Sequence, residues 1–245
     1  RRPISWITAA TERLFSPAMD AIVAVTPKIH DRFSRFHRRV VMIANFPLLP
    51  EFNARTRLTP GRPARVCYIG GISATRGAFE MVQAVAQAKT SVRLAIAGSY
   101  EDPELLRCLS NEPGWAQVDE YGFLSRLEVA ELLNSSVAGL VTLQPTPAYV
   151  AAYPVKLFEY MSAGIPVVAS DFPLLREIVE TANCGICVDP TNPQAIAEAV
   201  DELVSNPQLA ASLGKNGRRA IETRYNWSSE ATKLFATYEN VIRYS

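Results

Sequence analysis

The sequence predicts a doubly wound α/β fold, in which a parallel, Rossmann-like sheet is covered by helices on both faces. Three observations support this class. Short apolar runs recur along most of the chain, segments with helical periodicity lie between them, and the runs are continuous rather than alternating in polarity. Continuous apolar strands are typical of parallel sheets that are buried on both faces. With 245 residues, of which 48% are hydrophobic, the chain can bury a substantial core.

Eight apolar runs are expected to form strands. In chain order they span residues 20–25, 39–44, 65–70, 92–98, 117–122, 137–143, 165–170 and 185–188. Helical periodicity marks the segment GAFEMVQAVAQA, which starts at Gly77, and the segment RLEVAELLNSS, which starts at Arg126. In the second segment we expect Leu127, Leu132 and Leu133 on one face. The chain ends in two further helical segments.

Residues 47–64 interrupt this alternation. The stretch PLLPEFNARTRLTPGRP is rich in Pro and poor in apolar residues, which is typical of an extended linker. Residues 1–46 hold a partial unit, residues 65–227 are expected to form the main domain, and residues 228–245 a terminal helix. Because the first residue is Arg rather than Met, we expect the chain to begin inside a longer protein.

Charge is distributed unevenly along the chain. Residues 1–65 carry a net charge of +8 and residues 66–245 carry −7. An anionic membrane surface or acidic ligand explains the basic part, and so does a solvated face or a contact with an acidic domain. Aromatic residues are not interleaved with the basic ones beyond Phe33 and Phe36, so we expect no nucleic-acid partner. The apolar runs are too short to span a bilayer and no signal peptide is recognisable, which predicts a cytoplasmic protein.

Cys184 and Cys187 have a C-x-x-C spacing, which occurs in redox and zinc sites. Here the segment CGICVDP is itself a predicted strand, and the two histidines lie far away in the sequence. A redox pair belongs at the start of a helix, and zinc needs two further ligands. We therefore expect two small buried apolar side chains in a reducing compartment.

Two segments after strands are candidates for ligand binding, because doubly wound sheets bind ligands at the carboxyl ends of their strands. In the first, YIGGISATRG, Gly70 and Gly71 allow a phosphate to approach the backbone closely. Arg76 adds a guanidinium that can bind phosphate oxygens with two N–H groups. Taken alone, this segment equally fits a tight turn with a surface arginine.

The second segment contains the start of a helix, with Pro154 expected at the first helical position. The free N–H groups there and the ammonium of Lys156 form an anion site. Glu159 shares the face of Lys156, and a simple ion pair between the two is one interpretation. Their mostly apolar neighbours favour another, because charges removed from water need strong partners. In that interpretation a diphosphate binds Lys156 and a sugar diol binds Glu159.

Together these segments resemble the C-terminal nucleotide-sugar-binding domain of retaining glycosyltransferases of the GT-B fold, family four (group 1). The resemblance covers residues 20–245 and includes YIGGISATRGAFEMVQAV, VDEYGFLSRLEVAELL and PVKLFEYMSAGIPVVASDFPLLREIV. It implies that residues 1–46 are the tail of the N-terminal acceptor domain, most of which is missing from this chain, and that the last helix crosses back to that domain. The implied substrates are a UDP-, GDP- or ADP-sugar donor and a glycan or lipid-linked acceptor. The segment PTPAYVAAYPVKLFEYM is similar to bacterial enzymes of O-antigen and other surface-polysaccharide synthesis.

The resemblance implies a role for each matching residue. Glu159 corresponds to the second glutamate of an E-x7-E motif, which holds the ribose hydroxyls of the donor. Arg76 corresponds to a residue that contacts the donor diphosphate. Pro154, Val155 and Lys156 correspond to the helix start that cradles the distal phosphate.

The remaining matches are glycines, and one position departs from the family pattern. Gly70 and Gly71 correspond to the glycine-rich first turn, although many members have Arg at the position of Gly71. Gly122 corresponds to a turn beside the base. Ala151 replaces the first glutamate of E-x7-E, which approaches the donor sugar, so this replacement bears on sugar recognition.

The implied reaction is sugar transfer with retention, in which Arg76, Lys156 and the helix start stabilise the leaving diphosphate. No D-x-D motif occurs, so we expect neither a metal nor a cofactor. We expect the chain alone to bind the donor without turnover, because the acceptor groups belong to the missing domain. Two alternatives stay open: a catalytically inactive binding or scaffold module, which Ala151 permits, and an NAD-dependent oxidoreductase, against which the missing dinucleotide fingerprint argues.

Overall fold

The computed structural model describes residues 2–48 and 63–244. The chain divides into two compact units. The larger unit is Pro47–Tyr225, and the smaller unit joins Arg1–Phe46 to Asn226–Ser245. Most of the predicted linker at residues 47–64 lies outside the described residues. The smaller unit is therefore discontinuous in sequence, with the larger unit inserted between its two parts.

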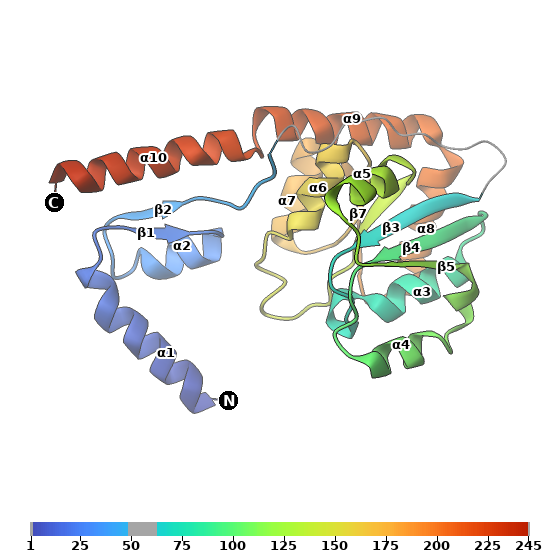
Figure 1. Ribbon diagram of the computed structural model, residues 1–245, viewed down its shortest axis with the longest axis horizontal. Helices are drawn as coiled ribbons and strands as arrows, with labels where there is room; N and C mark the ends of the chain where they lie inside the picture. Colours follow the sequence, from blue (N-terminus) through green and yellow to red (C-terminus); the bar gives the residue numbers. More distant parts are fainter. Residues whose placement is uncertain (1, 49–62, 245) are drawn as a thin grey trace. The chain divides into compact units, whose positions relative to one another are not determined.

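The larger unit contains a fully parallel, six-stranded sheet, as predicted (Figure 1). Its strands are β3 Ala64–Ile69, β4 Val92–Ala97, β5 Val118–Gly122, β6 Ala138–Val141, β7 Val167–Ser170 and β8 Gly185–Val188. Their order is β5-β4-β3-β6-β7-β8. The chain runs outward from β3 to β5, returns to β6 and then runs outward in the other direction. The neighbours β3 and β6 form a topological switch point, which is where doubly wound sheets bind ligands.

Helices cover both faces of this sheet (Figure 1). The helix α3 packs against α8 on one face, and α6 packs against α5 and α9 on the other. The helices are α3 Ala78–Gln87, α4 Pro103–Leu109, α5 Arg126–Asn134, α6 Val155–Ala163, α7 Pro173–Ala182, α8 Pro193–Ser205 and α9 Pro207–Thr223, with the short 3-10 helices η3 Ala74–Arg76 and η4 Pro113–Gln117. The six strands predicted for this region are confirmed, with boundaries that differ by up to two residues.

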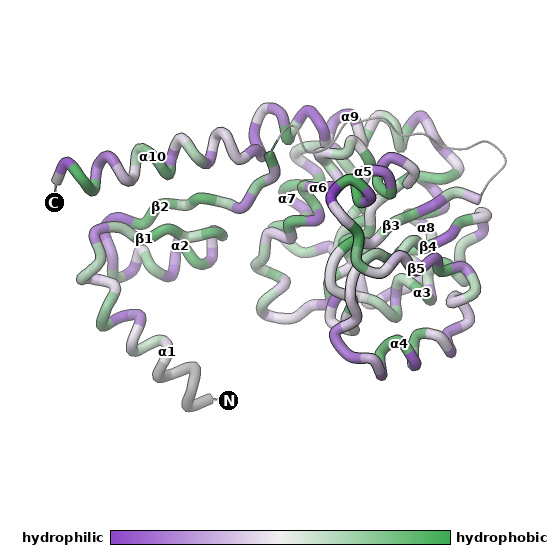
Figure 2. The backbone as a smooth tube through the Cα atoms, viewed as in Figure 1, coloured by the Kyte–Doolittle hydropathy of each residue, from purple (hydrophilic) through white to green (hydrophobic). Residues whose placement is uncertain are grey.

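Close packing of helices completes the core of the larger unit. Figure 2 shows hydrophobic and hydrophilic residues alternating along α9, which buries one face. A Cβ atom at Gly214 of α9 would lie 2.1 Å from the Gly164 carbonyl oxygen at the end of α6, so only glycine allows this approach. The expectation for α5 was wrong at Leu127, which is 80% exposed, because this helix buries its last turn through Leu132 and Leu133.

The smaller unit is built from short elements at the start of the chain and one long helix at its end. They are α1 Arg2–Phe15, the 3-10 helix η1 Ser16–Ala18, β1 Ile22–Ala24, α2 Pro27–Phe33, β2 Val40–Met42 and α10 Trp227–Tyr244. The strands β1 and β2 pair in parallel. The Glu230 carboxylate of α10 is 2% exposed and accepts hydrogen bonds from the Ala44 amide at 2.8 Å and the Lys233 ammonium at 2.6 Å. Through Glu230, α10 is tied to the segment that follows β2.

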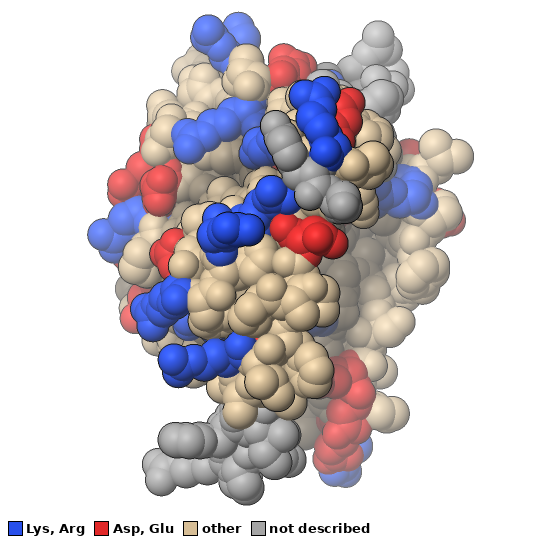
Figure 3. Space-filling model, turned by 90° about the vertical axis from the view of Figure 1, so that its left-hand side faces the viewer, with Lys and Arg blue, Asp and Glu red and all other residues tan. Residues whose placement is uncertain are grey.

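The surface of the smaller unit carries both apolar and basic side chains. Exposed apolar residues are Leu14, Phe15, Met19, Val23 and Val25, together with Phe235, Tyr238 and Ile242 on α10. Exposed basic residues include Lys28, Arg32, Arg35 and Arg38. Figure 3 shows Lys and Arg side chains gathered beside a broad uncharged area on one face of the molecule. None of the described helices combines the length and hydropathy of a membrane-spanning segment.

Candidate nucleotide-binding site

The predicted site residues lie at the carboxyl edge of the central strands. A cavity of about 250 Å³ opens there. It is lined by Ile69, Gly70, Ala97, Gly98, Phe123, Leu124, Arg126, Val129 and Glu159. The cavity thus brings the end of β3 together with the ends of β4 and β5 and with the middle of α6. Two predicted residues, Gly70 and Glu159, line it directly.

Glycines let the loops at this edge approach one another. Gly70 has a φ of +109° and Gly98 a φ of +146°, a region that other residues rarely adopt. A Cβ atom at Gly98 would lie 2.0 Å from the Gly70 carbonyl oxygen. Gly77, with a φ of +80°, brings the start of α3 equally close to the Thr142 carbonyl oxygen after β6. The turn after β3 and the start of α3 therefore lie in close contact with the residues that follow the neighbouring strands β4 and β6.

Lys156 stands in the first turn of α6, beside this turn. Its Nζ atom is buried and has no hydrogen-bond partner among the residues that the structure describes. The ammonium lies 3.4 Å from the centroid of the Tyr68 ring and 3.7 Å from the place of a Cβ atom at Gly70. Burial lowers the pKa of Lys156 well below its ordinary value, and the charge of Arg76 lowers it further, while Glu159 raises it. A buried, unpartnered cation at a helix start is prepared for an anion.

Arg76 ends η3 and points back at the turn after β3. Its Nη1 atom donates a hydrogen bond to the Gly71 carbonyl oxygen at 3.0 Å. A Cβ atom at Gly71 would lie only 2.2 Å from this Nη1 atom. Glycine at this position therefore leaves room for the Arg76 guanidinium, which gives a physical reason for the absence of the arginine that the resemblance would place there.

Glu159 pairs with a residue that the sequence did not indicate. Its side chain is 15% exposed, and Oε1 accepts a hydrogen bond from Arg126 Nη1 at 3.0 Å. No ion pair among the described residues joins Lys156 to Glu159, so the simple interpretation of these two charges was wrong. Arg126 is 64% exposed and begins α5, whose start is fixed by a capping box between Ser125 and Glu128. That capping signal is readable in the sequence and predicts a helix start at Arg126, but it does not indicate the contact of Arg126 with Glu159.

The other predicted residues occupy neighbouring positions. Pro154 is the N-cap of α6 and not its first helical residue, because the helix begins at Val155. Val155 is 41% exposed. Gly122 ends β5 with a φ of +60°, and its carbonyl oxygen accepts a hydrogen bond from the Gly98 amide at 2.7 Å. Ala151 lies half-buried in the turn before α6.

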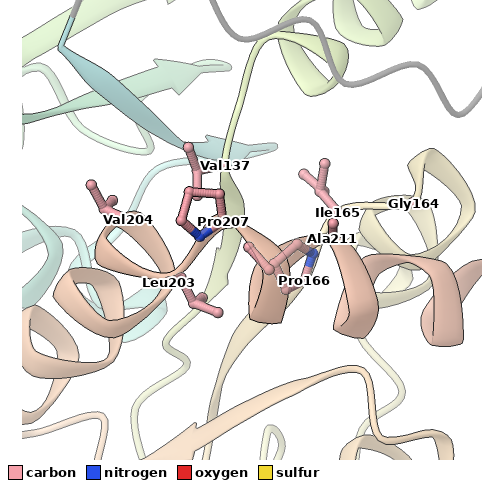
Figure 4. Close-up of a pocket in the computed structure, with 9 residues that line it drawn as sticks. Val137, Gly164, Ile165, Pro166, Leu203, Val204, Pro207 and Ala211 are labelled. Carbon is pink, nitrogen blue, oxygen red and sulfur yellow. The ribbon is translucent and has the colours of Figure 1, made fainter.

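The larger apolar cavity of the same unit contains none of these residues. It measures about 400 Å³ and lies at the amino ends of β6 and β7 (Figure 4). It is lined by Val137, Gly164, Ile165, Pro166, Leu203, Val204, Pro207, Ala210 and Ala211. Since no ionisable or hydrogen-bonding side chain lines it, the cavity at the carboxyl edge is the better candidate for binding a charged ligand.

The cysteines form no disulfide in the described chain. Cys184 is buried and Cys187 half-buried, and burial raises the pKa of their thiols to about 12 and about 11. Both are therefore neutral thiols at physiological pH. Across residues 2–48 and 63–244, no group of His, Cys, Asp and Glu side chains is arranged to hold a metal ion.

Known proteins share this fold and this sequence pattern. The chain is 27% identical over 198 residues to alpha-maltose-1-phosphate synthase of Mycobacterium tuberculosis, which covers 77% of this chain and 50% of that protein. Sucrose-phosphate synthase from Thermosynechococcus elongatus superposes with a TM-score of 0.81 at 23% identity, over 97% of this chain and 62% of that one. Anabaena HepE in complex with UDP superposes with a TM-score of 0.79 at 16% identity, over 95% of this chain and 67% of HepE.

The similarity to these proteins covers only part of their length. The chain spans about half the length of the curated relatives it matches, for example 50% of alpha-maltose-1-phosphate synthase. The family model described as Glycosyl transferases group 1 matches residues 51–220, which is most of the larger unit and includes every predicted site residue. The chain therefore belongs to the group 1 glycosyl transferases, whose GT-B fold contains the Rossmann-like sheet described above.

Proposed function

We propose that this chain carries the donor-binding half of a glycosyltransferase. The donor is a nucleotide-diphosphate sugar, the acceptor is a glycan or a lipid-linked glycan, and transfer retains the anomeric configuration. The observation that carries the proposal is the buried Lys156 ammonium, which has no hydrogen-bond partner among the described residues and lies beside Arg76 and the glycine turn. Membership of the group 1 family supports it, as does the fold shared with HepE, which was solved in complex with UDP and with UDP-glucose.

In this proposal each residue of the candidate site has a chemical task. The diphosphate binds against Lys156, Arg76 and the start of α6, and the ribose hydroxyls donate to the Glu159 carboxylate in the cavity. As the bond to the sugar breaks, negative charge grows on the leaving diphosphate, and the two cations stabilise it more in the transition state than in the ground state. Because two side-chain cations face the diphosphate, we propose that neither a metal ion nor a cofactor takes part.

The acceptor side belongs to residues outside this chain in the proposal, because the chain spans only about half the length of its relatives. Binding of the donor then requires this chain alone, whereas transfer requires an N-terminal domain as well. A lipid-linked acceptor in bacterial surface-polysaccharide synthesis, such as that of O-antigen, would place the protein at the inner face of the plasma membrane. The exposed basic residues Lys28, Arg32 and Arg35 fit peripheral contact with an anionic surface.

Calorimetric titration with UDP, GDP, ADP and NAD, without added metal, tests the proposal. We expect saturable binding of one nucleoside diphosphate. Glu159→Ala should weaken that binding about tenfold, since two hydroxyl hydrogen bonds are lost, with the melting temperature unchanged. Lys215→Ala, at an exposed position of α9, serves as the control and should bind like the unmodified chain. Tight binding of NAD would contradict the proposal and favour an oxidoreductase.

Ala151 favours one alternative, an inactive binding module with the same fold. The side chain in the turn before α6 is a methyl group, where the family pattern has a glutamate that approaches the donor sugar. An inactive module would bind the nucleoside diphosphate without distinguishing its sugar. Comparing UDP with UDP-glucose and UDP-galactose decides between the two: affinities that differ between sugars support a transferase, and equal affinities support the inactive module.

A further inference from the structure

Tyr68 of β3 links the two cationic side chains of the candidate site, and we propose that it is a positioning residue for the donor diphosphate. This inference rests on the proposed function and deepens it. Tyr68 is fully buried, and it belongs to the core of the larger unit together with Val66, Ile72 and Ala78. Its ring face nevertheless contacts the Lys156 ammonium, and its hydroxyl donates to the Gly71 carbonyl oxygen, which also accepts a hydrogen bond from Arg76.

The ring face holds the ammonium of Lys156. The Nζ atom lies 3.4 Å from the ring centroid, well inside the range of a cation–π contact. Such contacts are strongest where water is excluded, and this Nζ atom is buried without a hydrogen-bond partner among the described residues. The Tyr68 ring therefore contributes an attraction that keeps the Lys156 ammonium beside the glycine turn before an anion arrives.

The hydroxyl of the same side chain acts on Arg76. Tyr68 Oη donates a hydrogen bond to the Gly71 carbonyl oxygen at 2.7 Å, and Arg76 Nη1 donates to the same oxygen at 3.0 Å. Burial raises the pKa of Tyr68 far above its ordinary value, so the hydroxyl stays protonated and remains a donor. By fixing the Gly71 carbonyl, Tyr68 fixes the anchor point of the guanidinium.

A tyrosine that only filled the core would behave differently. Loss of its hydroxyl would lower the stability of the fold and would act on all ligands alike. A positioning residue acts through Arg76 and Lys156, so its loss affects the diphosphate part of a ligand and not the nucleoside part. Comparing a nucleoside diphosphate with its nucleoside therefore separates the two roles.

The test titrates the 245-residue chain with whichever of UDP, GDP and ADP it binds best, and with the matching nucleoside. Tyr68→Phe keeps the ring and removes the hydroxyl. We expect about a fivefold loss of affinity for the nucleoside diphosphate and none for the nucleoside. In an Arg76→Ala background, Tyr68→Phe should have no further effect, because the Gly71 carbonyl no longer anchors a guanidinium.

Tyr160→Phe is the matched control. Tyr160 is equally buried, and its hydroxyl accepts a hydrogen bond from the Ile69 amide at 3.0 Å. Its removal should leave the affinity for the nucleoside diphosphate unchanged. Tyr68→Leu also removes the ring, and it should weaken binding of the nucleoside diphosphate about tenfold more than Tyr68→Phe does. In a Lys156→Ala background this additional loss should disappear, because no ammonium is left for the ring to hold. Should Tyr68→Leu fail to fold, Tyr68→Phe decides alone.

Two results would overturn the proposal and leave the proposed function standing. One is equal affinity of Tyr68→Phe and the unmodified chain for the nucleoside diphosphate. The other is an equal loss for the nucleoside diphosphate and the nucleoside. If the unmodified chain binds none of the three nucleoside diphosphates, the inference and the proposed function fall together.

Discussion

The ammonium of Lys156 is a proton-binding group whose surroundings change when a ligand enters. In the structure described, burial and the charge of Arg76 lower its pKa well below the ordinary value for lysine. A diphosphate placed against it would favour the charged form and raise that pKa. Between the two pKa values, the free protein lacks a proton that the complex holds. Affinity for a nucleoside diphosphate should therefore fall as pH rises through this window.

Proton uptake on binding is the measurable form of this linkage. At pH 8 the terminal phosphate is fully ionised, because its second pKa is about 6, so the ligand contributes no proton change. We expect calorimetric titrations in two buffers of different ionisation enthalpy, repeated at rising pH from pH 8, to show net uptake of protons once the pH lies between the pKa values of Lys156 in the free protein and in the complex. Lys156→Met should abolish the uptake as well as weaken binding. Equal heats in both buffers at every pH tested would contradict the linkage between binding and the protonation of Lys156.

Gly71 offers a second prediction for a single residue. A Cβ atom there would collide with Arg76 Nη1, which is the far end of a flexible side chain, so Gly71→Ala should displace the guanidinium at little cost to the fold. We expect about a fivefold loss of affinity for the nucleoside diphosphate at an unchanged melting temperature. The same change in an Arg76→Ala background should have no effect on affinity, and a loss of the same size there would place the cause elsewhere.

At the scale of elements, the contact between α6 and α9 depends on two glycines with different surroundings. A Cβ atom at Gly214 would lie 2.1 Å from the Gly164 carbonyl oxygen, whereas one at Gly217 would meet no atom nearer than 3.2 Å. Gly214→Ala should therefore destabilise the protein by about 1–3 kcal/mol, because backbone must move. Gly217→Ala should be close to neutral, since better helix propensity offsets the tight contact. Urea denaturation of both variants checks this, and equal midpoints would contradict it.

The sequence predicted elements well because their signals are local. The six strands of the sheet follow from apolar runs of the right length, and the end of α6 follows from Gly164. Contacts within the site are not local. Arg126 and Glu159 are 33 residues apart in sequence, and Tyr68 is still farther from Lys156, so no spacing in the sequence announces either pair. Each becomes visible only when the order of the strands brings the loops together.

At the scale of the whole molecule, the two units differ in how much apolar surface they bury. The larger unit encloses a sheet between two layers of helices, while the smaller unit has a two-stranded sheet and exposes Phe15, Val23 and Val25. An isolated pair of parallel strands is weak. We therefore expect two thermal transitions, with the smaller unit unfolding first. Hydrogen exchange measured by mass spectrometry would assign each transition to its unit.

Glu230 allows this order to be tested by substitution. Glu230→Ala leaves the Ala44 amide without its buried acceptor, which should destabilise the smaller unit by about 1–3 kcal/mol and lower only the first transition. Glu239→Ala, at an exposed position of the same helix, is the control and should leave both transitions in place. A single transition that moves with Glu230→Ala would show that the two units unfold together.

The hydrogen bond between Glu230 and Ala44 also bears on how the protein is made. Its two partners are separated by the entire larger unit, which a ribosome must synthesise before α10 emerges. At ordinary rates of translation this takes on the order of ten seconds or more, long enough for the larger unit to fold on its own. Throughout that interval the segment that follows β2 lacks its hydrogen bond to α10. During synthesis the segment that holds β1 and β2 therefore waits longest in this chain for its packing partner, and we expect it to be the part most prone to aggregate.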